Sequence, residues 1–410
     1  MTFNTPSESQ LVDTNPKPPS IYLDKVGIIG AGPAGLAAAI ALEKQGLDVH
    51  IFERTKAFRP IGAGVTLSPN GVKSLAAIDA DIVQQLKQQG SQLNRFRIRT
   101  TRGWPILNQP VKDDEYDQPF LAIRWFSLQE IMRAKLPPEI LHLNHQLIHF
   151  EQNQQSVNLS FDNGETASVD LLIGADGIRS VVRKQLFGLE DPAYGGWMTW
   201  RGVQKYQHRL LPPHHTTIFA KRGKSLILLD NGQGYLSWAL EMINPTIHRS
   251  QHPEAAKARV LQELDHWHPA LQELIKLTDA DTIVERPVCE PIILPQWSNG
   301  RVTLIGDAAH PMAPFLGQGT NTTFEDVWAL STCLSQQDNL EAALDQYEAS
   351  RIERAQTIQY RTMFSAAQMR NPFLRPQWFK TSLGEVPKQA KVSEKAFSDW
   401  LYQYDPSAQA

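Results

Sequence analysis

The stretch from Val26 to Arg54 constrains the fold of this 410-residue chain more than any other. An apolar run, Val26 to Ile29, leads directly into GAGPAG at Gly30 to Gly35 and then into an Ala/Leu-rich segment. A second apolar run, Leu47 to Phe52, ends in Glu53. Strand, glycine-rich turn, helix, strand and terminal acid in this order are the fingerprint of a βαβ unit that binds a dinucleotide.

Each glycine of the fingerprint has its own physical role. Gly30 permits the tight turn from strand to helix, Gly32 lets the backbone approach a pyrophosphate, and Gly35 lets the helix pack closely on the strand. The pyrophosphate is expected at the helix N-terminus, where unpaired N–H groups favour an anion. Glu53 lies 18 residues beyond Gly35, near the spacing at which an acid binds a ribose diol.

Composition sets the broad class. The chain is 41% apolar and 20% charged, typical of a soluble globular protein, and its length suffices for two or three domains. A net charge of −3 gives no electrostatic reason to expect nucleic acid as a partner. Residues 1–21 are expected to be a disordered leader rather than a signal peptide, and no integral membrane segment is expected. Cys289 and Cys333 have no metal-binding spacing, which favours reduced thiols in a cytoplasmic protein.

The patterning predicts further elements along the chain. Helices are expected over 71–89, from a cap at Ser127, over 253–277, over 322–334 and over 340–363. Strands are expected over 93–101, 147–161, 166–173, 197–203, 217–220, 225–229, 235–242 and 301–305, with a tight turn at Asp162-Asn163-Gly164. His142, His145 and His149 lie where a loop enters a strand, without nearby Cys or acidic partners, so no metal site is expected.

Two later motifs repeat the pattern of a buried strand that delivers glycines and an acid to a helix start. The first is GADGIRS at 174–180, and the second is GDAAHPMAPFLGQGTN at 306–321. Such geometry suits further edges of one nucleotide site. Because nucleotide elements recur this far apart, the cofactor domain must be discontinuous. We expect it to comprise 22–80, 105–182 and 285–335, with a substrate domain of 81–104 and 183–284 and C-terminal helices and tail over 336–410.

These three motifs together resemble the class A flavoprotein monooxygenases, which have the fold of p-hydroxybenzoate hydroxylase. The resemblance extends from about Lys25 to Arg354. It is nearest to salicylate or 3-hydroxybenzoate hydroxylases, urate hydroxylases and zeaxanthin epoxidases, because the expected strand TWRGV at 199–203 resembles theirs. It implies an α/β fold: a discontinuous, Rossmann-like FAD-binding domain (GR2-type), an inserted, mainly antiparallel β-sheet substrate domain and a C-terminal helical region. One departure is Phe324, preceded by Thr322-Thr323, where relatives often carry an Ala-rich stretch.

The resemblance also assigns cofactor contacts. It implies that FAD is held through its pyrophosphate, its adenosine, its ribityl chain and its ring system by Gly30, Gly32, Ala34, Gly35, Glu53, Arg54, Gly64, Val65, Arg124, Asp307, Gly317, Gln318, Gly319, Thr320 and Asn321. Asp176 and Arg179 belong to a motif linked with both FAD and NAD(P)H. A helix N-terminus at the pyrimidine edge would stabilise negative charge on the reduced flavin.

The implied reaction is hydride transfer from NADH or NADPH to FAD, reaction with O2 to a C4a-hydroperoxyflavin, and hydroxylation or epoxidation of a small substrate, expected to be aromatic. The cofactor carries the chemistry, and the protein orients it and excludes water. Arg201 and Tyr235, with Trp238 beside them, and Pro314 near the flavin face are the pocket candidates. A monomer or a homodimer is expected.

Two alternatives stay open from the sequence. One is a flavin-dependent reductase of isoprenoid double bonds, similar to geranylgeranyl reductase, which would not need O2. The other is a non-catalytic FAD-fold binding protein, similar to the GDP-dissociation inhibitors, although that group lacks the flavin-facing GQGTN loop present at 317–321.

Overall fold

The computed structural model describes residues 23–60, 63–111, 115–371 and 373–409. The predicted leader therefore lies outside the described residues. The helices are α1 (Pro33–Glu43), α2 (Pro69–Ile78), α3 (Ala80–Gln89), α4 (Trp125–Arg133), α5 (Val181–Phe187), α6 (Pro253–Glu263), α7 (Pro269–Leu277), α8 (Gly319–Gln336), α9 (Leu340–Arg370) and α10 (Glu394–Tyr402).

A mainly parallel sheet carries the fingerprint. Its strand order is β18 (Ser298–Asn299), β19 (Val302–Leu304), β12 (Leu171–Gly174), β1 (Lys25–Ile29), β2 (Asp48–Glu53) and β8 (Leu141–Leu143). Strand β1 pairs in parallel with both β2 and β12, and β12 with β19, so all three glycine motifs follow neighbouring strands at the same edge. The predicted βαβ unit is confirmed.

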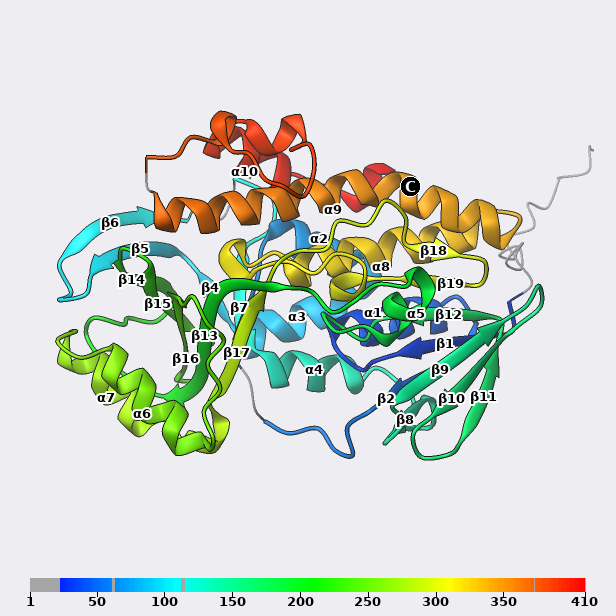
Figure 1. Cartoon of the computed structure of the whole chain (residues 1–410), viewed down its shortest axis with the longest axis horizontal. Helices are drawn as coiled ribbons and strands as arrows, with labels where there is room; N and C mark the ends of the chain where they lie inside the picture. The colour runs from blue at the N-terminus through cyan, green and yellow to red at the C-terminus, as the bar shows by residue number, and fades with distance from the viewer. Residues whose placement is uncertain (1–22, 61–62, 112–114, 372, 410) are drawn as a thin grey trace, which may run out of the picture.

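A second large sheet is mainly antiparallel and forms the left part of the molecule in Figure 1. Its order is β17 (Val284–Cys289), β13 (Tyr194–Lys205), β16 (Tyr235–Ile243), β15 (Lys224–Asp230), β14 (His215–Lys221), β5 (Arg95–Thr100) and β6 (Pro105–Pro110). Helices α6 and α7 cover one of its faces (Figure 1). The predicted α/β fold with an antiparallel sheet inserted into it is confirmed.

Two small antiparallel sheets complete the fold. One consists of β11 (Thr166–Val169), β10 (Val157–Phe161) and β9 (Leu147–Gln152), at the end of the molecule opposite the large antiparallel sheet (Figure 1). The other consists of β3 (Gly64–Leu67), β7 (Phe120–Arg124) and β4 (Ser91–Leu93). Helix α9 runs along α8 (Figure 1), and its Met369 carbonyl accepts a hydrogen bond from Gly223 N at 3.3 Å, so α9 joins the two parts of the fold.

Five local predictions are wrong. The strand predicted over 147–161 is two antiparallel strands, β9 and β10. The helix predicted over 71–89 breaks at Asp79, whose extended backbone (φ −156°) lets its carboxylate cap α3. The helix predicted over 253–277 breaks before Pro269, which begins α7. Ser127 is buried inside α4 rather than capping it. The strand predicted over 166–173 splits into β11 and β12, which belong to different sheets.

The predicted domain division stays a prediction, but the pairing qualifies two boundaries. Strands β5 and β6 form one hairpin, which a boundary between 104 and 105 would cut. Strand β17 pairs with β13 in the antiparallel sheet, although residues from 285 onward were assigned to the cofactor domain. Among the described residues, none of the helices is both long and apolar enough to cross a bilayer.

Candidate active site

The turn after β1 is built to bring the backbone close to a ligand. Gly30 has φ +104°, and a Cβ there would lie 2.6 Å from the Ala175 carbonyl oxygen. A Cβ on Gly35 would lie 1.9 Å from the Gly30 carbonyl oxygen. A Cβ on Gly32, in contrast, would meet no described atom within 4 Å. The turn is therefore packed tightly on the protein side and open at Gly32.

The start of α1 supplies donors to this open side. Gly32 is the N-cap and provides no side-chain cap, and the first turn carries no acidic residue. The N–H groups of Ala34 and Gly35 belong to this first turn, where backbone donors lack partners within the helix. An uncapped helix start beside open space fits the pyrophosphate of a dinucleotide.

Glu53 closes the turn from the side of β2. Its carboxylate accepts hydrogen bonds from Ala31 N at 2.8 Å and from Thr55 N at 2.9 Å. The Ala31 carbonyl accepts a further hydrogen bond from Gln129 Nε2 at 2.8 Å. Arg54, the other residue predicted here, is exposed.

In the motif after β12, the carboxylate of Asp176 binds the backbone at the start of α5. One oxygen of the Asp176 carboxylate accepts from Val181 N at 2.7 Å and from Val182 N at 3.2 Å, so Asp176 caps α5. Its other oxygen is buried and has no hydrogen-bond partner among the described residues. Burial raises the pKa of this carboxyl, although the hydrogen bonds oppose the shift. Arg179 is exposed.

Arg183 is a buried residue of this region that the sequence reasoning missed. Its guanidinium donates to the carbonyl oxygens of Asp307 at 3.2 Å and Ala308 at 2.9 Å, which ties α5 to the third motif. The only signal in the sequence is an arginine in the helix that follows GADGIRS, and the two carbonyls that tie it to the third motif lie more than a hundred residues away.

The third motif places an unpaired carboxylate beside a second open helix start. Asp307 lies in the 3-10 turn η3 (Gly306–Ala308) and has neither a hydrogen bond nor an ion pair to any side chain that the structure describes. Burial raises its pKa, opposed by the fields of His310, Arg183 and Arg201. Helix α8 has no side-chain cap and no acid in its first turn, and a Cβ on Gly319 would lie 3.6 Å from Asp307 Oδ1.

In the loop at 317–321, which is predicted to face the flavin, the side chains of Gln318 and Asn321 point into the protein. Asn321 Oδ1 accepts from Ser68 N at 2.9 Å, and its Nδ2 donates to the carbonyls of Thr66 and Gly317. Gln318 Nε2 donates to Ser68 Oγ at 2.8 Å. Both side chains are buried and brace the loop, which leaves the backbone of Gly317 and Gly319 and the partly exposed Thr320 on the open side.

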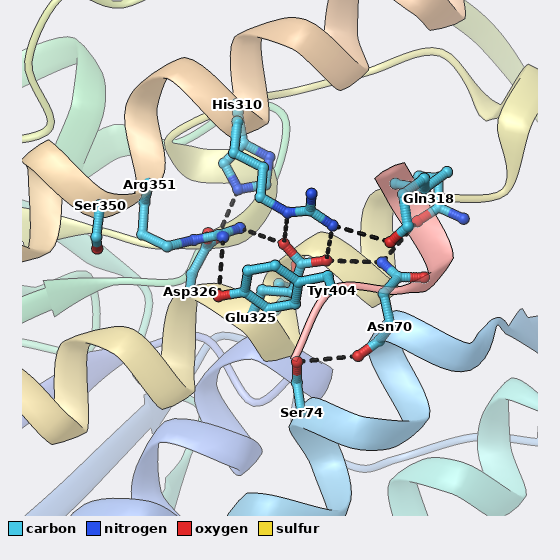
Figure 2. A network of polar contacts seen from close by, with 12 residues as sticks. Asn70, Ser74, His310, Gln318, Glu325, Asp326, Ser350, Arg351 and Tyr404 are labelled. Atoms are coloured by element: carbon cyan, nitrogen blue, oxygen red, sulfur yellow. Dashed lines mark hydrogen bonds and ion pairs between the residues drawn. The ribbon is translucent and has the colours of Figure 1, made fainter. Parts of the chain in front are cut away.

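A buried ionic network supports this loop from behind (Figure 2). Glu325 accepts from Arg354 Nε at 2.7 Å and from Asn70 Nδ2 at 2.7 Å, and pairs with Arg351 Nη2 at 2.8 Å. Burial alone would raise the pKa of Glu325, but Arg354 and Arg351 outweigh it and lower the pKa to about 2. Asn70 also donates to Gln318 Oε1 at 3.1 Å, so the network reaches the loop directly.

The C-terminal segment completes the network. Arg354 Nη2 donates to the Leu401 carbonyl at 3.0 Å, and the Tyr404 ring lies 4.1 Å from the Arg354 guanidinium carbon. Asp326 binds both Arg351 Nε at 3.0 Å and His310 Nε2 at 2.5 Å (Figure 2). The tail, for which the sequence predicted no role, therefore joins the network behind the loop at 317–321.

Phe324, the departure noted in the motif, is fully buried in the main core. Its bulk is accommodated without exposing the ring.

The antiparallel sheet turns one face toward these motifs, which we call the inner face, defined by Thr199, Arg201, Tyr235, Ser237, Ala239 and Glu241. A Cβ on Gly64 would lie 2.2 Å from Ser237 Oγ, so β3 touches this face. Trp197, one further strand step from Thr199, contacts Phe315 of η4 (Pro314–Leu316) with ring centroids 4.9 Å apart. The loop with Pro314 thus lies over the inner face.

Tyr235 and Arg124 meet at one end of the inner face. The Arg124 guanidinium carbon lies 4.0 Å from the Tyr235 ring centroid. In the pairing of β3 with β7, Gly64 is opposite Arg124 and Val65 is opposite Ile123. The structure therefore brings these four predicted residues, Gly64, Val65, Arg124 and Tyr235, to one place.

Trp238 does not belong to this pocket, and its prediction as a pocket residue is wrong. Side chains alternate along β16, so Trp238 points to the opposite face and packs under α6 and α7. Its Nε1 donates to Thr278 Oγ1 at 3.0 Å, and 1% of the residue is exposed.

Two charged residues lie in the middle of the inner face. Arg201 is opposite Ala239 on β16, and its Nε donates to Thr199 Oγ1 at 3.4 Å. Glu241 is the diagonal neighbour of Arg201, is 3% exposed, and has no hydrogen bond or ion pair to any described residue. Burial raises the pKa of Glu241 to about 7, although the charge of Arg201 opposes the shift.

In the described part of the chain, no cluster of His, Cys, Asp or Glu could hold a metal ion.

This arrangement of three glycine motifs and a facing antiparallel sheet is that of an FAD-dependent enzyme. Residues 24–362 match the family described as the FAD binding domain, and the chain belongs to that family and to its class A flavin monooxygenases. The resemblance inferred from the sequence is confirmed, as is the assignment of an FAD-dependent monooxygenase.

Among its relatives, the aurachin C monooxygenase/isomerase of Stigmatella aurantiaca is 31% identical over 80% of this chain and 85% of its own length. The 6-hydroxynicotinate 3-monooxygenase of Bordetella bronchiseptica is 31% identical over 82% of this chain and 89% of its own length. A crystal structure of a variant of Klebsiella pneumoniae HpxO complexed with FAD superposes with a TM-score of 0.78 and 27% identity, and covers 85% of this chain and 91% of that one.

Proposed function

We propose that this enzyme uses NADH or NADPH and O2 to hydroxylate a small aromatic substrate held between the η4 loop and the inner face. The observation that carries the proposal is that two contacts bracket the middle of that face. Gly64 abuts Ser237 at one end, and the Phe315 ring contacts the Trp197 ring edge-on at the other. The strand steps between them present Thr199, Arg201, Ala239 and Glu241 toward the cofactor motifs.

The residues present fit FAD, and we assign them accordingly. The uncapped start of α1 at Ala34 and Gly35 would bind the pyrophosphate, Glu53 the adenosine ribose, and the unpaired Asp307 the ribityl chain. When bound, FAD supplies the redox chemistry and the activation of O2. The start of α8 would favour negative charge at the pyrimidine edge of the ring system.

The remaining groups select and orient the substrate. Arg201 supplies a cation for an anionic or polarised oxygen of the substrate, and Pro314 and Phe315 form an apolar lid over the ring. Aromatic nitrogen heterocycles and aminohydroxybenzoates are named as substrates of relatives, which supports a ligand of this size and kind. A reductase of isoprenoid double bonds or a non-catalytic binding protein gains no support from these relatives.

The test is NAD(P)H oxidation by the purified, FAD-loaded protein under air with urate, 6-hydroxynicotinate and 3-amino-4-hydroxybenzoate, reading peroxide and hydroxylated product. We expect at least one compound to stimulate oxidation with product formed. FAD binding without stimulation by any compound would contradict the proposed substrate class. An Arg201→Gln variant should keep FAD and lose product.

A further inference from the structure

Glu241 is an unusual residue to find in the middle of a buried strand. It is 3% exposed, and its carboxylate is neither hydrogen-bonded nor ion-paired within the described residues. An isolated buried carboxylate is costly, because the protein replaces none of the interactions that water would give it. The residues directly opposite it are uncharged, Thr199 on β13 and Ser225 on β15.

The contrast with Glu325 shows that this fold pairs a buried carboxylate where the carboxylate is structural. Glu325 is equally buried but receives two arginines and an amide. Glu241 has none of these and lies on the inner face, between the contact of Gly64 with Ser237 and the contact of Phe315 with Trp197. A polar group left unpaired in that space is suited to a ligand that supplies its partner.

Resting on the proposed function, we propose that Glu241 accepts the proton of a ring hydroxyl or ring N–H of the substrate while Arg201 binds the anion so formed. The O–H or N–H bond of the substrate breaks, its electron pair stays on the substrate, and a new O–H bond forms on the Glu241 carboxylate. The transfer needs no oxidant or reductant. The electron-rich ring that results is the form best able to take up an electrophilic oxygen.

The surrounding charges suit this role. Arg201 on β13 is the cation whose field acts on Glu241, and it also acts on Asp307 of the facing loop. Arg286 on β17 lies opposite Thr199 but is exposed at the sheet edge. With its pKa raised to about 7 by burial, Glu241 can both hold and release a proton near neutral pH.

A proton acceptor at Glu241 limits the substrate to compounds with an acidic O–H or N–H group. A phenol, a hydroxypyridine or a purine carries an acidic O–H or N–H that Glu241 can accept. A carotenoid or another isoprenoid hydrocarbon carries none and would leave Glu241 buried without a partner. The pocket is therefore assigned to ionisable aromatic rings.

The experiment compares the wild type, Glu241→Gln, Glu241→Asp and Glu285→Gln across pH 6 to 9 with urate, 6-hydroxynicotinate and 3-amino-4-hydroxybenzoate, reading product and FAD content. Glu285→Gln is the matched control, because Glu285 lies on the same sheet but binds Trp200 Nε1 on the other face. We expect Glu241→Gln to keep FAD and to lose about 100-fold or more in kcat/KM for product at pH 7. The loss should shrink as rising pH ionises the substrate in solution.

Further outcomes separate this inference from the proposed function. Partial recovery in Glu241→Asp and an unchanged pH profile in Glu285→Gln would support the proton transfer. If Glu241→Gln forms product as fast as the wild type, or more slowly by the same factor at every pH, the role of Glu241 is overturned and the monooxygenase function stands. Absence of product in the FAD-loaded wild type with all three compounds would overturn both.

Discussion

Replacing Glu241 by Gln should make the substrate-free enzyme more stable at alkaline pH. The pKa of Glu241 is raised by burial from 4.5 to about 7, so the folded state holds a proton that the unfolded chain releases. Stability therefore falls as pH rises from 4.5 to 7, and the full cost applies above pH 7. At about 1.36 kcal/mol per pKa unit, that cost is roughly 3 kcal/mol, which the neutral amide avoids.

The assay is urea unfolding of the FAD-loaded protein at pH 5 and pH 8, followed by tryptophan and flavin fluorescence. Glu241→Gln should be more stable than the wild type by only about 1 kcal/mol at pH 5 and by roughly 3 kcal/mol at pH 8. Glu325→Gln provides the opposite case, because its pKa is lowered to about 2 and its charge stabilises the fold above pH 4.5. That variant should lose about 3–5 kcal/mol at pH 8. A Glu241→Gln protein less stable than the wild type at pH 8 would refute the reasoning.

Three further predictions concern the cofactor side. Gly35→Ala should fail to fold or to bind FAD, because its Cβ would lie 1.9 Å from the Gly30 carbonyl oxygen, as circular dichroism and FAD titration would reveal. Gly32→Ala should fold normally, since its Cβ meets no described atom within 4 Å, yet bind FAD at least tenfold more weakly in the same titration. Arg354→Leu should cost about 3–5 kcal/mol in urea unfolding by removing a cation from buried Glu325, and unchanged stability would contradict the role of the network.

Local sequence chemistry predicted the fold of the glycine motifs and the FAD-dependent class of the enzyme. The glycines at 30, 32 and 35 follow from backbone sterics within one βαβ unit, which is why their pattern is legible without a structure. Their separate roles reappear in the structure as two tight positions and one open one. The FAD-dependent class follows from three such motifs in order, and the family comparison confirms it.

The rest depends on contacts that no local pattern encodes. Gln318 and Asn321 were expected to face the flavin, but their partners lie some 250 residues earlier in the chain and turn both side chains inward. The helix breaks depend on single residues, Asp79 and Pro269, within otherwise helical runs.

Strand alternation separates the two faces of the antiparallel sheet. In the sequence YLSWALEMI at 235–243, Trp238 alternates in phase with Leu236 and Leu240, which places it in the core under the helices. The same alternation places Glu241 in phase with Tyr235 on the inner face. A carboxylate in that position is visible in the sequence, whereas its lack of a partner is visible only in the fold.

The most direct test of monooxygenase activity uses isotopically labelled oxygen gas. The FAD-loaded enzyme receives this gas with NAD(P)H and the compound that best stimulates oxidation, and the mass of the product is measured by mass spectrometry. We expect one labelled oxygen atom on the aromatic ring of the product. Stimulated oxidation that yields only labelled peroxide with every compound, or a product whose added oxygen comes from water, would contradict that expectation.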